Sequence, residues 1–135
     1  MESKIVKFIS KHHVMTLATQ SDKGPYCANA FYAYAPESKG LIFSTDAAAT
    51  RHGAEMVASR DVAASIVLET KVVGRLQGVQ ITGRIVEATG EDRKLYLAKF
   101  LYAAVVDLCL WRLEIDYAKL TDNTLGFGKK LIWNR

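Results

Sequence analysis

The chain has 135 residues, a length that suits a single domain with a hydrophobic core, and we expect one domain over residues 1–135. Half of the residues are hydrophobic and 24% are charged, which excludes a largely disordered protein. The formal net charge is only +4, and acidic residues are interspersed with the basic ones. Nucleic-acid binders more often gather Lys and Arg on one face, so this composition argues against that class.

The first residues carry a helical pattern. Ile5, Val6, Phe8 and Ile9 gather on one side of a helix, and Ser3 is available as its N-cap. No apolar run is long enough for a signal peptide or a membrane span. We therefore expect a cytoplasmic protein.

Most of the remaining chain has the pattern of short strands. The quartet Ser21–Gly24 is rich in turn formers and joins the first two strands in a hairpin. In the last strand, apolar residues alternate with Arg112, Glu114 and Asp116, which is typical of a strand with one solvent-exposed face. The six predicted strands span Val14–Thr19, Tyr26–Tyr34, Leu41–Thr45, Val62–Leu68, Leu76–Val86 and Leu108–Tyr117.

Two further helices interrupt the strands. One is predicted around Thr50–Ser59, and the other over Glu91–Tyr102 with Thr89 near its cap. The connections between consecutive strands are too short for parallel crossovers. The predicted fold class is therefore mainly β with inserted helices, a small six-stranded antiparallel barrel.

The C-terminal segment contains the first candidate site. Gly126 and Gly128 flank Phe127 and allow the backbone to approach a ligand closely, while Lys129 and Lys130 bring positive charge to the same place. An anionic, partly aromatic ligand would suit such a segment. The alternative is a last strand with an exposed basic turn.

The junction between the third strand and the second helix is another candidate site. The strand ends in the hydroxyl side chains of Ser44 and Thr45, and Thr50 suits the cap of a helix that begins with Arg51 and His52. Free backbone amides and the positive end of the helix dipole, beside Arg51, would form a phosphate-binding site. The alternative is a capped surface helix with an exposed arginine.

Two strands carry polar residues that suit a ligand. Gln77 and Gln80 lie near two glycines in the fifth strand, where an amide can bond the heteroatoms of a ligand or a facing subunit. In the second strand, Asn29 and Phe31 lie among small residues that leave room for a flat ring. The alternatives are a solvated strand face and a narrow barrel.

No catalytic group stands out in the sequence, which has no nucleophile elbow, useful carboxylate pair or Walker loop. We interpret His12 and His13 as a helix-terminal pair and not as a metal site. Cys27 and Cys109 lie in apolar runs and are interpreted as two buried thiols. Binding groups without acid–base machinery are typical of a protein whose cofactor brings its own reactivity.

Several segments together resemble a known family. The order of elements, with Phe43–Asp46 leading into Thr50–His52 and later Gly78–Gly83, resembles the pyridoxamine phosphate oxidase-like flavoproteins with the FMN-binding split barrel. More narrowly, Cys27–Tyr32 and Thr121–Lys130 are similar to a small bacterial branch of that superfamily. The resemblance covers nearly the whole chain. It implies a homodimer whose two FMN sites lie between the subunits, each built by both chains.

The resemblance also implies which residues bind the cofactor. The phosphate and ribityl chain would be held by Ser44, Thr45, Thr50, Arg51 and His52. The isoalloxazine ring would be lined by Asn29, Ala30 and Phe31. The partner subunit would contribute Gln77 or Gln80, Phe127 and Lys129.

Two features set this chain apart from the oxidases that give the family its name. Those enzymes use a strand-two Arg and Lys and a C-terminal Arg-Leu-His-Asp-Arg-like stretch, where this chain has Asn29, Phe31 and Gly128–Lys130. We therefore do not expect pyridoxamine phosphate oxidation. His52 stands where the family often has Lys, which predicts a modest affinity for FMN because a neutral imidazole adds no fixed charge.

The leading hypothesis is an FMN-dependent oxidoreductase that moves electrons between NAD(P)H and a small molecule. The first alternative is a non-catalytic binder of flavin, deazaflavin or histidine-ligated haem on the same scaffold, because a fold does not fix a function. The second is a basic module that binds RNA or an acidic protein through Lys129, Lys130 and Arg135.

Overall fold

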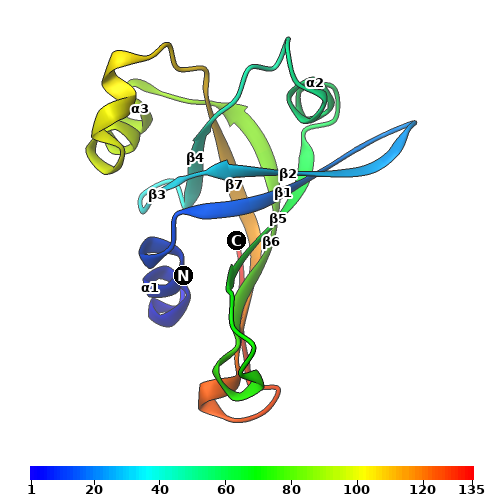
Figure 1. Ribbon diagram of the computed structural model, residues 1–135, viewed down its shortest axis with the longest axis vertical. Coiled ribbons are helices and arrows are strands. Elements are labelled where there is room, and N and C mark those ends of the chain that lie inside the picture. Colours follow the sequence, from blue (N-terminus) through cyan, green and yellow to red (C-terminus); the bar gives the residue numbers. More distant parts are fainter.

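The computed structural model describes residues 1–135 and shows a barrel-like sheet with helices packed around it (Figure 1). The strands are β1 (Val14–Ser21), β2 (Gly24–Phe31), β3 (Ala33–Ala35), β4 (Gly40–Ser44), β5 (Asp61–Leu68), β6 (Gln77–Glu87), β7 (Leu110–Asp122) and β8 (Lys130–Asn134). The α-helices are α1 (Ser3–Lys11), α2 (Arg51–Ala58) and α3 (Gly90–Lys99), and the 3-10 helices are η1 (Val73–Arg75), η2 (Leu101–Val105) and η3 (Asn123–Leu125). None of the helices combines the length and the apolar character that a membrane crossing requires.

A bent strand closes the barrel. The strands are all antiparallel and follow the order β2-β1-β5-β6-β7-β4-β3, and β2 continues into β3 with only Tyr32 between them. At this bend the Tyr32 amide donates to the carbonyl of His13, and its buried hydroxyl donates to the carbonyl of Ile9 at 2.6 Å. The predicted strand Tyr26–Tyr34 is therefore two strands, of which the first pairs with β1 and the second with β4.

The predicted fold class is confirmed, although the chain has eight strands instead of six. The two additions are β3, which the bend creates, and β8, which the C-terminal segment forms. The structure therefore agrees with the interpretation of that segment as a last strand with an exposed basic turn. The strand predicted over Leu108–Tyr117 begins at Leu110 and continues to Asp122.

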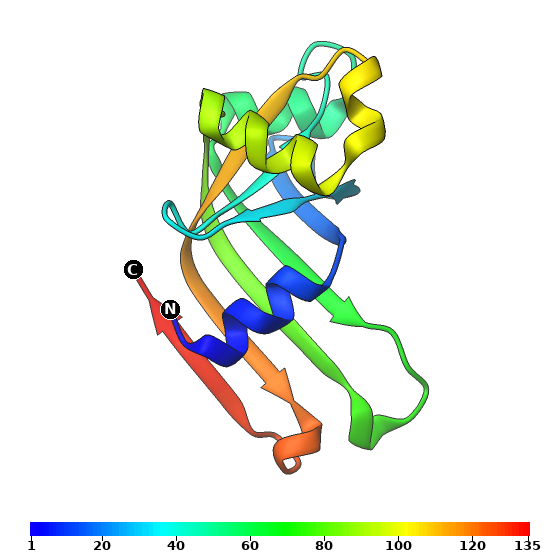
Figure 2. The same cartoon turned by 90° about the vertical axis from the view of Figure 1, so that its left-hand side faces the viewer.

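β7 has two partners along one edge. Residues 110–114 of β7 pair with β4, and residues 117–121 pair with β8. The ring is therefore split between these two pairings. Below the split, the tips of the β5–β6 and β7–β8 hairpins extend together, at the end opposite α2 and α3 (Figures 1 and 2).

A β-bulge in β7 changes which side chains face the core. Next to Gly83 the register with β6 shifts by one residue, so Asp116 has no partner in β6. Ile115 is buried before the bulge and Ala118 is buried after it. Tyr117, expected on the same face as Ile115, consequently lies on the outer face of the sheet.

Local capping signals place two of the three helices correctly. Thr50 caps α2, and Thr89 forms a capping box with Asp92 at the start of α3, as predicted. Ser3 was wrong as the cap of α1, because Glu2 occupies that position and makes no side-chain capping bond. The third helix ends at Lys99, and the residues up to 105 continue as η2.

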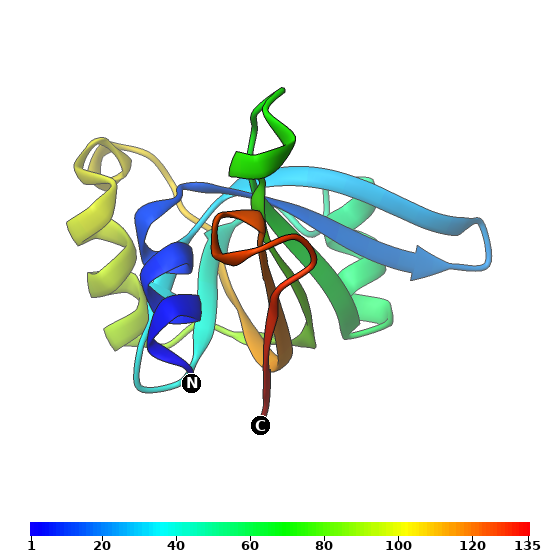
Figure 3. The same cartoon turned by 90° about the horizontal axis from the view of Figure 1, so that it is seen from below.

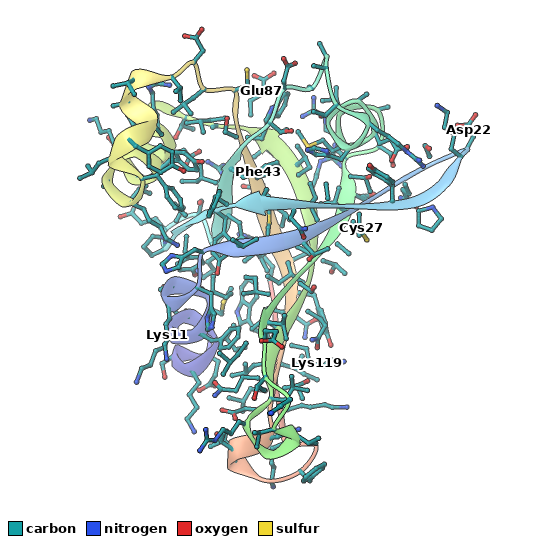
Figure 4. The ribbon with its side chains drawn as sticks, viewed as in Figure 1. Lys11, Asp22, Cys27, Phe43, Glu87 and Lys119 are labelled. Carbon is teal, nitrogen blue, oxygen red and sulfur yellow. The ribbon has the colours of Figure 1, made fainter.

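The main core fills the barrel interior, and α1 covers one opening of it (Figure 2). Ile5, Phe8 and Ile9 of α1 are buried and belong to the same core cluster as Phe43 of β4, which is labelled in Figure 4. A smaller core lies beneath α3, where Tyr96 and Phe100 pack on Ile42.

The prediction that both cysteines are buried was wrong. Cys27 is exposed on the outer face of β2, opposite Ala18 of β1, and Cys109 is exposed just before β7 begins. Figure 4 shows Cys27 on the projecting β1–β2 hairpin, whose tip carries Asp22. The burial of these cysteines was inferred from the apolar residues around them, but an apolar run does not reveal which side of a strand lacks a covering element.

Candidate functional site

The start of α2 offers two free backbone amides. Thr50 has an extended backbone, and its hydroxyl accepts from the Gly53 amide at 3.1 Å and donates to the carbonyl of Asp46 at 2.8 Å. The amides of Arg51 and His52 have no acceptor within the chain. A Cβ on Gly53 would lie 2.5 Å from the Thr50 hydroxyl, so only glycine allows this tight turn. The helix therefore presents donors suited to an anion.

Thr45 and His52 form a hydrogen-bonded pair beside these amides. The Thr45 hydroxyl lies 2.6 Å from Nε2 of His52. Burial lowers the pKa of His52, so the imidazole is neutral at neutral pH. This pair supplies hydrogen-bonding groups at the start of α2 but no fixed positive charge.

Arg51 supplies the positive charge, and contacts with Glu55 and Tyr26 hold its side chain in place. Its Nε donates to the carboxylate of Glu55 at 3.0 Å, and its guanidinium stacks 4.1 Å from the centre of the Tyr26 ring. The buried Glu55 carboxylate also accepts hydrogen bonds from Thr19 at 2.9 Å and Ser21 at 2.8 Å. These bonds join α2 to the β1–β2 hairpin. Both terminal nitrogens of Arg51 remain without a hydrogen bond in the chain, so the anchored side chain still offers donors.

The Ser44 side chain forms a hydrogen bond with the backbone. Its hydroxyl accepts from the Cys109 amide at 3.2 Å, and the Trp111 indole donates to the Thr45 carbonyl at 3.3 Å. These bonds tie the end of β4 to the start of β7. Ser44 therefore holds the shape of the junction and retains one hydroxyl proton for a ligand.

The outer face of the sheet brings Asn29 and Gln80 into one row. Cross-strand pairing aligns Asn29, Thr16, Ser65 and Gln80 on neighbouring strands. The Thr16 hydroxyl donates to the Asn29 side chain at 3.1 Å. Three strand spacings separate the row's ends, about 14 Å. A shallow cavity of about 330 Å³ lies along this face.

The three residues expected to line a flat ring do not share a face. Asn29 and Phe31 point outward, whereas Ala30 packs against the main core. Phe31 is half exposed, and its ring lies 5.7 Å from that of Phe100 at the end of α3. Asn29 and Phe31, together with Cys27, are therefore side chains of this strand that a ligand on the outer face can reach.

The C-terminal candidates lie at the other end of the molecule. Gly126 and Gly128 have positive φ angles of 123° and 73°, and the turn between them leaves Phe127 79% exposed. Lys129 is also exposed, at the tip beside η1. Gln77 lies at the adjoining end of β6, opposite Asp122. Phe127, Lys129 and Gln77 therefore lie in neighbouring segments, and the hairpin tips that carry them are far from the start of α2 (Figure 1).

Sequence reasoning missed the residues that anchor Arg51. Glu55 follows Arg51 at the helical spacing of four, so an ion pair could have been predicted from the sequence. Tyr26 lies on another element, and no local pattern links it to Arg51. No cluster of three His, Cys, Asp or Glu side chains suits a metal ion.

The family model described as pyridoxamine 5'-phosphate oxidase matches residues 1–121. The chain belongs to this family. It is also 38% identical to the UPF0306 protein YhbP of Salmonella newport over 135 residues, which covers 97% of this chain and 91% of that protein.

Solved structures of the same fold carry different descriptions. An FAD-binding protein from Mesorhizobium loti aligns with a TM-score of 0.69 and 19% identity over 87% of this chain and 89% of that one. A heme binding protein from Mycobacterium smegmatis aligns with a TM-score of 0.74 and 17% identity, covering 94% of this chain and 55% of that one. At these identities the alignments establish the split-barrel fold of this family member and leave its ligand to be argued from its own residues.

Proposed function

We propose that the protein is an FMN-binding flavoprotein and that the start of α2 holds the FMN phosphate. The observation that carries this proposal is the start of α2, where the Arg51 and His52 amides have no acceptor and the Thr45 hydroxyl lies 2.6 Å from Nε2 of His52. Arg51 in the first turn of the helix adds a positive charge whose terminal nitrogens are unbonded. Helix N-termini with an adjacent arginine suit phosphate groups. The neutral His52 adds no charge, so the site is expected to bind with modest affinity.

The outer face of the sheet is the proposed seat of the isoalloxazine ring. Asn29 offers amide hydrogen bonds and Phe31 an apolar edge, and the small neighbours Thr16 and Ala18 keep the surface flat. Bound flavin would supply the electron-transfer chemistry. The chain's own residues would bind and orient it.

A homodimer would unite the two halves of the site. In one chain, the β7–β8 hairpin tip, which carries Phe127 and Lys129, lies at the opposite end from α2, which begins with Arg51 (Figure 1). An antiparallel pairing of two copies would place the hairpin tips of one beside α2 of the other. The outer sheet face supports such a pairing, because Val67 on it is 56% exposed and Phe31, which meets only the edge of Phe100, is 50% exposed.

We propose an oxidoreductase activity that passes electrons from a nicotinamide donor to a small acceptor. The chain positions binding groups around the site and no pair of carboxylates or nucleophile with a base, which favours chemistry carried by the cofactor. The FAD-binding description of the Mesorhizobium loti neighbour agrees with a flavin on this fold.

The first experiment is the absorbance spectrum of freshly purified protein, followed by denaturation and mass identification of any released chromophore. Released FMN, or FMN binding upon its addition, is the expected result. Arg51→Ala is expected to weaken FMN binding by about tenfold or more, since it removes a charge-assisted phosphate contact. Arg93→Ala, which removes an exposed arginine from α3, is the control and should leave binding unchanged. A protein that takes up no FMN, or an Arg51→Ala variant that binds as wild type, would reject the site.

A non-catalytic carrier is the second candidate function. Two neighbours of this fold are described as a heme binding protein and a heme storage protein. His13 is exposed just before β1, next to the bend that follows Phe31, and its ring makes no hydrogen bond in the chain. A Soret band in place of the flavin spectrum, lost in His13→Ala, would favour this candidate.

A further inference from the structure

A groove with a basic rim lies between α1 and the lower ends of β6 and β7. It encloses about 290 Å³. Lys4, Lys7 and Lys11 line its helix side, at spacings of three and four that place them on one face of α1. Figure 4 shows Lys11 on this helix, and Figure 3 views α1 from the end at which the two hairpin tips project past it (compare Figure 1).

The positive charge of this rim is not balanced within the chain. None of the three lysines forms an ion pair. The only carboxylate in the groove belongs to Asp122, and one of its oxygens already accepts the Thr124 amide at 2.9 Å. Lysines three and four residues apart repel one another, and a lysine in the first turn opposes the helix dipole. A bound anion would relieve both effects.

The floor of the groove is apolar. Phe8, Leu68, Leu120 and Leu125 line it. Two further polar side chains, His12 and Gln77, line the groove. Nδ1 of His12 lies 2.9 Å from the Phe8 carbonyl, whereas the amide of Gln77 makes no hydrogen bond through its side chain. An inorganic ion would leave this apolar surface uncovered, so the lining suits a ligand with a charged head and an apolar body.

We propose that this groove binds a small organic anion, a carboxylate or phosphate monoester with an apolar body. The lysines would hold the charged group, Gln77 would bond a heteroatom, and Phe8 and the leucines would cover the body. The volume lies at the low end of ligand pockets, about 300 Å³, so the ligand is smaller than a flavin. The groove is distinct from the α2 site, because it is formed by α1 and the opposite end of β6 and β7.

The test is a titration of the full-length protein with phenyl phosphate, followed by amide NMR. Shifts are expected at α1 and at the lower ends of β6 and β7, with binding weakened about tenfold in the Lys7→Gln/Lys11→Gln double variant through loss of charge-assisted bonds. Lys94→Gln, which changes an exposed lysine of α3, is the matched control and should bind as wild type. Equal weakening by Lys94→Gln would show a general charge effect and overturn the proposal.

Two further measurements distinguish the contribution of the ligand's charged group from that of its apolar part. Benzoate should bind at the same residues as phenyl phosphate, whereas inorganic phosphate should bind at least tenfold more weakly, because it leaves the apolar floor uncovered. Leu125→Ala, at a partly exposed floor position, should weaken phenyl phosphate and leave inorganic phosphate unchanged. Equal affinities for phenyl and inorganic phosphate would refute an organic ligand.

Competition with FMN distinguishes this groove from the proposed flavin site. Phenyl phosphate should bind unchanged in the presence of FMN and in the Arg51→Ala variant. Displacement by FMN would assign the groove to the flavin and refute a separate site. Binding of phenyl phosphate by a protein that takes up no FMN would support the groove and count against the flavin proposal alone.

Discussion

Replacing Gly83 with alanine tests whether the bulge in β7 requires a residue without a side chain. A Cβ at this position would lie 2.1 Å from the carbonyl oxygen of Glu114 and 2.5 Å from Cδ2 of Leu113. The Leu113 side chain can turn away, but the Glu114 carbonyl belongs to the backbone of β7. Relief therefore requires the two strands to separate locally. Overpacking of this kind costs about 1–3 kcal/mol, and a backbone contact places Gly83→Ala near the upper end, about 3 kcal/mol.

Gly78→Ala is the matched control on the same strand. Gly78 is also buried, but a Cβ at this position would have the Ile66 carbonyl oxygen as its nearest neighbour, at 3.4 Å, which is an ordinary contact. We expect its free energy of unfolding to change by less than about 1 kcal/mol. Urea unfolding measures both variants, and the Gly83→Ala melting temperature should fall by about 10 °C. Equal stabilities of the two variants would refute the steric argument.

Three further predictions concern single hydrogen-bonding groups. Thr50→Ala removes the cap of α2 and should lower the unfolding free energy by about 1 kcal/mol, measured by urea unfolding. Tyr32→Phe leaves the Ile9 carbonyl without its donor at the bend and should cost about 1–2 kcal/mol in the same assay; no change would contradict the role given to the bend. Burial raises the pKa of Glu55, but hydrogen bonds from Arg51, Ser21 and Thr19 outweigh it and lower the pKa below the usual 4.5. The unfolded chain then binds more protons, so this stabilisation is complete above about pH 4.5 and is lost as the pH falls through the folded value. Thermal melts between pH 5 and about pH 3 should therefore show a melting temperature that changes less with pH in Glu55→Gln than in wild type.

The sequence predicted the features that depend on local chemistry. Thr50 and Thr89 cap their helices because a hydroxyl before a helix bonds its free amides, whatever surrounds it. The short turns and alternating strands likewise gave the antiparallel barrel. The bulge at Asp116 could not be predicted from the sequence, because a register shift depends on how two strands pair. The sequence of β7 alone shows only alternating apolar and polar residues.

The candidate site was predictable in part for the same reason. Thr45 and the helix start at Arg51 and His52 lie within one short segment of the sequence, and the structure brings Thr45 and His52 into hydrogen-bond distance. The stacking of Arg51 on Tyr26 joins residues far apart in the chain, and no periodicity encodes it. The exposure of Cys27 depends on which face of β2 lacks a cover, and that is decided by how all the strands pack.

β8 pairs with only one strand, so it forms an edge that can open without disrupting the rest of the sheet. Each strand of the ring is bonded on both sides, with the continuous β2–β3 segment counted as one, whereas β8 is bonded to β7 alone. Local opening of β8 consequently costs only its own ladder and leaves the ring intact, so its amides exchange with solvent sooner than those of β5 and β6. Any molecule that grips Phe127 or Lys129 has to hold this edge closed. Its binding energy is then reduced by the cost of ordering the edge, and its presence is reported by slower exchange in β8.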